Sequence, residues 1–228
     1  MGSTIGLAAH DLLLVKDNLA ASIREEIITG RLVPGEKIVE GKWAAKLGIS
    51  QTSIREALNI LAAEGFVHKG SGRTATVTKL SEEDIAHSYE LRAVLEGYAA
   101  RIVAQKQPDL SDLDQILADM RSAVECKNFR AFYERDLHFH LVMVEKTGNR
   151  MLEQLLKRII VPLFAFVVIR VYRTRNAPDQ WRKSLDQHKQ IIEALRSGDP
   201  VFAERLVTNS INRFFTETKQ VVAEAARQ

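Results

Sequence analysis

The sequence predicts a mainly α protein in two parts. An N-terminal winged helix-turn-helix with a small β-hairpin wing precedes an antiparallel all-α bundle of six helices. Residues 40–65 carry helix, turn and helix signals and lead into a Gly-rich basic turn between β-forming residues. From Ser81 onward, apolar residues recur at helical spacing. We therefore expect a leader over residues 1–15, a winged domain over 16–79 and a helical domain over 80–228.

The composition narrows the class of protein. Hydrophobic residues make up 46% and charged residues 27% of the chain, which is normal for a soluble globular protein, and the net charge of +3 permits a nucleic-acid partner. The single cysteine, Cys126, rules out an internal disulfide and fits a reducing cytoplasm. The most apolar run, residues 159–169, contains Pro162 and is too short to cross a bilayer, so we expect no membrane partner.

The winged domain is expected to begin with a helix over residues 17–29. Leu19, Ile23 and Ile27 share one face of this helix, and Gly30 ends it. A Leu-Val-Pro-Gly turn follows and leads into the helix-turn-helix.

The helix-turn-helix has recognisable ends and a clear buried face. Gly48 suits the left-handed position that closes the first helix, and Ser50 is a good N-cap for the second. In the second helix Ile54, Leu58 and Leu61 fall at i, i+4 and i+7, so they share the buried face. The opposite face starts with short polar or basic side chains, where a recognition helix contacts bases and phosphates.

The wing and the local charge also indicate DNA binding. Between residues 37 and 79, seven lysines and arginines face three glutamates, a local net charge of +4. Phosphate contacts need such an excess, and the wing tip would lie along the minor groove. The residues that we expect to contact DNA are Lys42, Ser50, Gln51, Thr52, Ser53, Arg55, Ser71, Gly72 and Arg73.

The helical domain opens at Ser81, an N-cap followed by three acidic residues. Pro108 and Pro178 fall between helices, and Asp199-Pro200 is an N-cap with proline at the first helical position. The expected helices cover residues 82–106, 111–127, 128–147, 150–173, 179–197 and 200–225.

Three polar residues fall on otherwise apolar stripes of this domain. Asp136 and His140 project inward one turn apart, whereas His138 points about 160° away from Asp136 and should be solvated. His188 lies on a second buried stripe, between Leu185 and Ile192. Such a set on facing helices suits a divalent metal. The alternative is a buried Asp–His pair and an unrelated core histidine.

Other inward polar groups are candidates for binding an effector. Arg92 and Glu96 share a stripe with Tyr89, and they form either a buried i, i+4 ion pair or a cationic site for a carboxylate ligand. Arg170 shares a face with Phe166 on the fourth helix, and Ser210 points inward from the last. The candidate effector-binding residues are Tyr89, Arg92, Arg170 and Ser210.

Together these motifs resemble the GntR-family transcriptional regulators of the FadR subfamily, with a C-terminal FCD domain and the six helices of the VanR-like branch. The DNA-binding signature is matched by residues 32–40, 47–50, 54–58 and 61–65. The FCD signatures are matched by Glu90-Leu91-Arg92 with Leu95-Glu96, by Asp136 with His140, by His188 and by Gly198-Asp199.

The resemblance implies a ligand-responsive regulator, not an enzyme, most often a repressor in this family. It would act as a homodimer on a pseudo-palindromic double-stranded operator. A small organic acid, such as a carboxylate, would enter a metal-assisted pocket. Asp136, His140 and His188 would hold the divalent metal, with Zn²⁺ first and Ni²⁺ or Mn²⁺ as alternatives. The competing readings are a metal-dependent enzyme with an appended DNA-binding module and a constitutive architectural DNA-binding protein.

Two residues depart from the family pattern. Gln51 stands where the family usually has arginine, and glutamine favours adenine where arginine favours guanine. Ser210 stands where the family has its last metal-binding histidine, which leaves three strong ligands.

Overall fold

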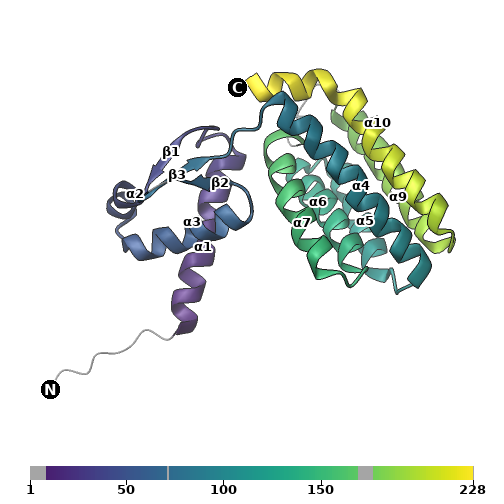
Figure 1. Ribbon diagram of the computed structural model, residues 1–228, viewed down its shortest axis with the longest axis horizontal. Helices are drawn as coiled ribbons and strands as arrows, with labels where there is room; N and C mark the ends of the chain where they lie inside the picture. Colours follow the sequence, from purple (N-terminus) through teal and green to yellow (C-terminus); the bar gives the residue numbers. More distant parts are fainter. Residues whose placement is uncertain (1–8, 71, 169–176, 228) are drawn as a thin grey trace. The chain divides into compact units, whose positions relative to one another are not determined.

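A computed structural model describes residues 9–70, 72–168 and 177–227 and divides the chain into two compact units. Unit 1 runs to Lys79 and unit 2 begins at Leu80. The predicted fold class is confirmed: the described residues are mostly helical, with one small antiparallel sheet in unit 1 (Figure 1). Each unit is described by itself.

Unit 1 contains a three-helix core and the wing. Its elements are α1 (Ala9–Ile28), β1 (Lys37–Val39), α2 (Glu40–Leu47), α3 (Gln51–Ala63), β2 (Val67–Lys69) and β3 (Thr74–Val77). The predicted hairpin is formed by β2 and β3, but the sheet has a third strand, because β1 pairs antiparallel with the other edge of β3. Strand β1 was not predicted, because its three residues are too few to show an alternating pattern.

The first helix differs from the prediction in two ways. It begins at Ala9, within the expected leader, and no glycine or proline interrupts it before Ile28. Its buried stripe consists of Ala20, Ile23 and Ile27, whereas Leu19 is only partly buried.

The helix-turn-helix has the predicted ends and core. Gly48 is left-handed, with φ 68° and ψ 28°, and the Ser50 hydroxyl accepts a hydrogen bond from Ser53 N at 3.0 Å. Ile54, Leu58 and Leu61 are fully buried. The start of α3 is therefore fixed by a cap at one end and by the core along one face.

Unit 2 is an all-α bundle. Its described helices are α4 (Glu82–Lys106), α5 (Ser111–Glu125), α6 (Phe129–Glu145), α7 (Arg150–Leu163), α9 (Ala177–Arg196) and α10 (Pro200–Arg227). The predicted N-cap at Ser81 is present and forms part of a capping box: Asp84 N donates to Ser81 Oγ at 3.0 Å and Ser81 N donates to Asp84 Oδ2 at 2.9 Å. Helices α4 and α10 run side by side (Figure 1), because Gly97 leaves room for Thr208.

The helix expected over residues 150–173 is not regular in its described part, and residues 169–173 lie outside the described residues. After α7 the chain forms the π-helical turn η1 (Phe164–Val168). Pro162 is inside α7 and has no N–H to donate, which disturbs the α-helical hydrogen bonds just before this turn. None of the described helices is long and apolar enough to cross a membrane.

Candidate functional site

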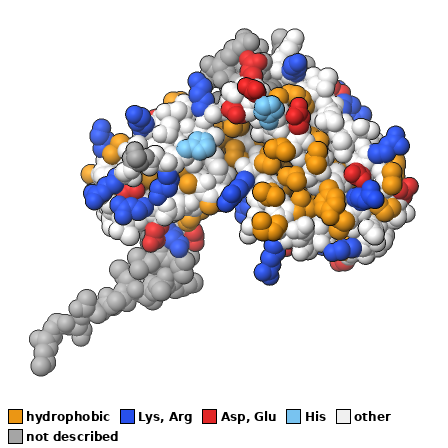
Figure 2. Space-filling model, in the orientation of Figure 1, with side chains coloured by type: hydrophobic (Ala, Val, Ile, Leu, Met, Phe, Trp, Pro, Cys, Tyr) orange, Lys and Arg blue, Asp and Glu red, His pale blue; other side chains and the backbone are white. Residues whose placement is uncertain are grey.

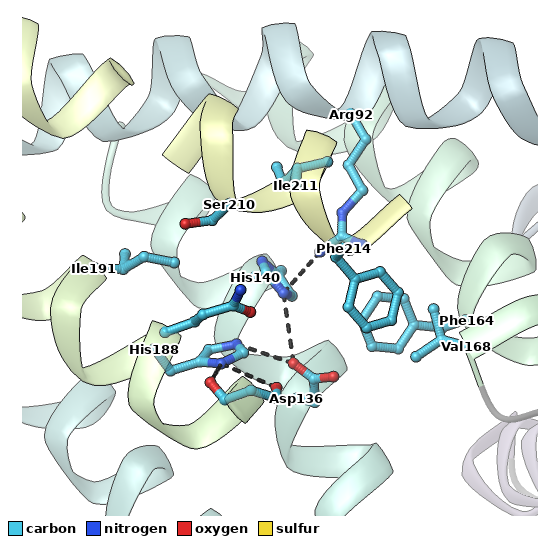
Figure 3. Close-up of a pocket in the computed structure, with 12 residues that line it drawn as sticks. Arg92, Asp136, His140, Phe164, Val168, His188, Ile191, Ser210, Ile211 and Phe214 are labelled. Atoms are coloured by element: carbon cyan, nitrogen blue, oxygen red, sulfur yellow. Dashed lines mark hydrogen bonds and ion pairs between the residues drawn. The ribbon is translucent and has the colours of Figure 1, made fainter. Parts of the chain in front are cut away.

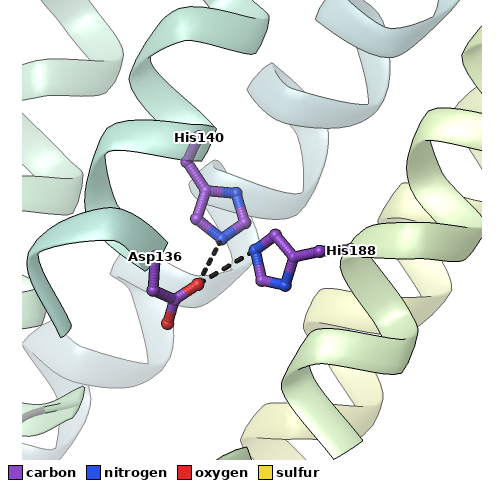
Figure 4. A group of neighbouring side chains, drawn as sticks. All are labelled: Asp136, His140 and His188. Atoms are coloured by element: carbon purple, nitrogen blue, oxygen red, sulfur yellow. Dashed lines mark ion pairs between the residues drawn. The ribbon is translucent and has the colours of Figure 1, made fainter. Parts of the chain in front are cut away.

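Three predicted metal ligands come together inside unit 2. Asp136 and His140 lie one turn apart on α6, and His188 faces them from α9 (Figure 4). All three are buried, and one potential ligand atom from each lies within 4.8 Å of the others. His138, on the same helix, is exposed, as predicted.

The orientation of His140 is set by Glu96 of α4. His140 Nδ1 lies 2.5 Å from Glu96 Oε2, and because an ionised carboxylate only accepts hydrogen bonds, the proton is on Nδ1. Nε2 then carries the lone pair. It lies 3.5 Å from Asp136 Oδ1, and Arg92 Nη2 donates to it at 2.8 Å. In metal sites a metal-binding histidine frequently donates its other ring N–H to a buried carboxylate, which fixes the orientation of the ring.

His188 is oriented by the backbone of its own helix. Its Nδ1 lies 2.6 Å from the Ser184 carbonyl oxygen, which can only accept, so Nδ1 carries a proton. Nε2 lies 2.9 Å from Asp136 Oδ1, but without the geometry of a hydrogen bond. Asp136 Oδ1 therefore faces the Nε2 atoms of both histidines, an arrangement in which one carboxylate oxygen and two imidazole nitrogens can share a cation. The donor set therefore fits a divalent metal ion.

The ionisable groups of the buried site shift one another's pKa values. Burial alone would raise the pKa of Glu96, but Arg92 and His140 outweigh it and lower this pKa to about 2. Burial also opposes ionisation of Asp136, yet the two histidines hold its pKa far below the usual range. For His140, burial acts against the charged form, but Glu96 raises the pKa. Two ionised carboxylates and one fixed cation, Arg92, leave one negative charge whenever both imidazoles are neutral, which is the form in which they bind a metal.

A small cavity of about 30 Å³ adjoins these residues (Figure 3). This volume is enough for an ion with one or two waters but not for an organic acid. Its lining residues come from α4, α6, η1, α9 and α10: Arg92, Asp136, His140, Phe164, Val168, Ser184, Gln187, His188, Ile191, Ser210, Ile211 and Phe214.

The predicted effector residues are placed differently from one another. Arg92 forms the expected ion pair, since its Nε donates to Glu96 Oε1 at 2.5 Å, and its side chain also lines the cavity. Ser210 lines the cavity from α10. Tyr89 does not line it: the ring stacks on Phe215 with centroids 4.7 Å apart, and burial raises the pKa of its hydroxyl. Arg170 lies outside the described residues.

Several of the predicted DNA-contacting residues lie near the start of α3. Gln51 and Thr52 are exposed at the start of α3, and Lys42 is exposed on α2. The wing reaches α3, because Arg73 Nη1 donates to Gln51 Oε1 at 3.5 Å. Ser50 and Ser53 also form the helix cap described above, Gly72 adopts a φ of 94°, and Ser71 lies outside the described residues.

Arg55 has a partner that the sequence analysis did not identify. Glu40 is buried, with 1% of its surface exposed, and it accepts from Arg55 Nε at 3.1 Å and Nη2 at 2.8 Å. The hydrogen bond from Arg55 lowers the pKa of Glu40 and raises that of Arg55. The pair directs the guanidinium while Nη1 keeps its donors for another acceptor.

Glu96 and Ser184 were also missed as orienting groups, although both carried a signal. Each lies one helical turn from a candidate, Glu96 after Arg92 and Ser184 before His188. Glu40 carried no such signal, since it belongs to a different helix from Arg55.

Comparison with known proteins identifies both units. Residues 15–77 match the profile described as "Bacterial regulatory proteins, gntR family", and residues 87–213 match the FCD domain. One relative is the "Probable D-xylose utilization operon transcriptional repressor" of Paenarthrobacter nicotinovorans, which is 27% identical over 90% of this chain and 91% of its own length. The gluconate operon transcriptional repressor of Bacillus licheniformis is 25% identical over 90% and 84%.

Among solved structures, E. coli McbR/YncC has the same fold. Its TM-score is 0.73 at 18% identity, and the match covers 90% of this chain and 97% of that one.

Proposed function

Since the chain belongs to the gntR family of bacterial regulatory proteins and carries an FCD domain, we propose that it is a repressor released from its operator by a small organic acid. That it is a transcriptional regulator and not an enzyme follows from the family and its relatives. Repression, the operator, the dimer, the metal and the acid belong to the proposal. The observation that carries it is the buried Asp136–His140–His188 cluster with Arg92 beside it.

The DNA contacts in this proposal come from α3 and the wing. Gln51 and Arg73 lie together, and Arg55 is held at the same end of α3 by Glu40. Gln51 would select adenine at its base position. A binding selection on random DNA, run with the wild type and with Gln51→Arg, tests this: the base preferred at one position of each half-site should change from adenine to guanine. An unchanged preference would refute this role of Gln51.

A dimer would bring two such units to the half-sites of a pseudo-palindrome. An exposed apolar face on unit 2 supports this (Figure 2). It consists of residues that are 46% to 66% exposed: Leu91, Val94 and Tyr98 of α4 with Met151 and Leu155 of α7. Helix α4 has acidic residues in its first turn and Lys106 in its last, so an antiparallel pairing of α4 with its copy would place opposite charges together.

Light scattering tests the dimer. The wild type should have twice the mass of one chain, and Val94→Glu should shift it towards the mass of one chain because a charge would be buried at the centre of the face. Ser122→Glu, an exposed position on α5, is the matched control and should stay dimeric. A Val94→Glu protein as dimeric as this control would exclude the face as the interface.

The metal, in this proposal, is held by Asp136 Oδ1, His140 Nε2 and His188 Nε2. When bound it supplies a positive charge in the cavity to which a carboxylate can bind. The chain's own contribution is to fix both imidazoles through Glu96 and the Ser184 carbonyl. Arg92 lines the same cavity and offers N–H donors beside His140.

The cavity must enlarge to admit an organic acid. Phe164 and Val168 of η1 and Ile211 and Phe214 of α10 form much of its apolar wall. A ligand that binds only the enlarged form shifts the protein towards that form, and DNA release follows only if the enlarged form binds the operator less well.

Fluorescence anisotropy with the DNA upstream of the gene tests the whole proposal. The protein, with and without Zn²⁺, should bind this DNA, and one acid of a metabolite panel should release it. A reporter gene behind the same DNA should be repressed until that acid is added. Binding that no compound changes would support the architectural alternative, and activation of the reporter would refute repression.

A further inference from the structure

A second, larger hollow lies on the outer side of α10. It is a groove of about 690 Å³ between α9 and α10, well within the size range of ligand pockets. Its lining residues are Gln190, Asp199, Val201, Phe202, Arg205, Leu206, Asn209, Ser210 and Arg213.

Ser210 lines both this groove and the small inner cavity. The side chain of serine is short, so the wall between the two spaces is thin at this point. The inner cavity holds no more than an ion and waters, and an acid bound there must extend its body in some direction. The shared wall makes the groove the nearest space for it.

The groove is lined by both cationic and apolar side chains of α10. Arg205, Asn209 and Arg213 are exposed and follow one another at i, i+4 and i+8 on α10. In the described part of the chain, neither arginine forms an ion pair, and the acid of the groove, Asp199, caps α10 by accepting from Val201 N and Phe202 N at 3.0 Å. Two arginines with free donors favour an anionic group.

The apolar residues of the groove are Val201, Phe202 and Leu206, and the first two are 53% and 49% exposed. Contact with a hydrocarbon chain would remove this apolar surface from water, which is favourable. A ligand with an anionic end and an apolar body therefore matches both kinds of side chain in the groove.

We propose that the groove is an outer subsite for the far end of the effector, and that the effector is a linear organic acid with two anionic groups. One carboxylate lies in the inner cavity at Arg92, the chain passes Ser210, and the second anionic group is bound by Arg213. Arg213 is three residues from Ser210, about 4.5 Å along the helix axis, and Arg205 is five residues away in the other direction, about 7.5 Å. Longer acids can therefore reach Arg205. This inference rests on the proposed function and names the class of its effector.

Isothermal titration calorimetry with defined acids tests the subsite. The probes are succinate, glutarate, adipate and pimelate, with butyrate and hexanoate as monocarboxylates, each added to the full-length protein with Zn²⁺. At least one diacid should bind about tenfold more tightly than the monoacid of similar length, as expected for one added charge-assisted contact. Arg213→Gln should remove most of this advantage and leave monoacid binding unchanged. Arg121→Gln, exposed on α5, is the matched control and should bind like the wild type.

The outcomes separate the subsite from the function it serves. If a monoacid binds and releases the DNA but no diacid binds better, the proposed function stands and the outer subsite is wrong. The subsite is also wrong if Arg213→Gln and Arg205→Gln bind every diacid like the wild type. If none of the acids binds the wild type, the diacid class is excluded, and release by an unrelated metabolite in the anisotropy assay would still support the regulator.

Discussion

Glu96→Gln is the substitution that most directly tests the electrostatics of the buried site. The glutamine has nearly the same shape, so no cavity is formed, but Arg92 loses the carboxylate that its Nε contacts at 2.5 Å. Both residues are almost completely buried, with side chains 5% and 0% exposed. Removing one partner of such a pair costs about 3–5 kcal/mol, because the other charge remains buried without compensation.

The pKa of Glu96 gives an independent estimate of this magnitude. A fall from 4.5 to about 2 corresponds to about 3 kcal/mol at 1.36 kcal/mol per pH unit. Because the pKa is lower in the folded state, this stability is present above pH 4.5 and is lost as the pH falls towards 2. The wild type should therefore lose more stability than Glu96→Gln between pH 5 and pH 2.

Urea denaturation followed by circular dichroism measures both effects. The titrations are run at pH 7 and at steps down to the acid limit of reversible folding, with a chelator so that no metal contributes. Glu125→Gln, an exposed glutamate on α5, is the control and should change the free energy of unfolding by less than about 0.5 kcal/mol. A loss below about 1 kcal/mol for Glu96→Gln at pH 7, with an unchanged m-value, would refute the reasoning.

Three further results are expected. Zn²⁺ should raise the melting temperature of the chelator-treated wild type but not that of Asp136→Asn, and elemental analysis of protein purified without added metal should find an ion only in the wild type. Equal shifts of the melting temperature in the two proteins would exclude this metal site. Glu40→Gln should weaken operator binding about tenfold without changing the melting temperature of unit 2, because Arg55 loses the carboxylate that orients it. Unchanged affinity for the operator in anisotropy titrations would mean that the orientation of Arg55 does not matter. Gly97→Ala should destabilise the bundle by about 1–3 kcal/mol in urea, because the new Cβ would lie 2.4 Å from Thr208 Oγ1, and a neutral effect would show that Thr208 simply turns away.

The helical periodicity of the sequence was sufficient to predict which polar residues face inward. Asp136, His140 and His188 are all buried, because burial of a helix face follows directly from a repeat of 3.6 residues. The same rule predicted the core of α3 and the exposure of His138. Fold class and candidate cluster could therefore be read from local patterns.

Contacts between elements could not be predicted in this way. The pairing of Glu40 with Arg55 depends on how α2 packs on α3, and the pairing of Glu96 with His140 depends on how α4 packs on α6. The π-helical turn η1 likewise follows a proline whose effect on the hydrogen bonds is decided by its neighbours. Periodicity describes a face of a helix but not the residue opposite it.

The contact between Arg92 and His140 affects how tightly the buried site can bind an ion. Arg92 Nη2 donates to the same Nε2 lone pair that a metal would take, so the guanidinium acts as an internal competitor tethered at the site. An incoming ion must first displace it, and the measured affinity equals the intrinsic affinity reduced by the free energy of that contact. Because Arg92 is part of the same chain, this reduction in affinity for the ion is the same at every protein concentration. Substitution of Arg92 would therefore change the affinity of this site for an ion while Asp136, His140 and His188 stay in place.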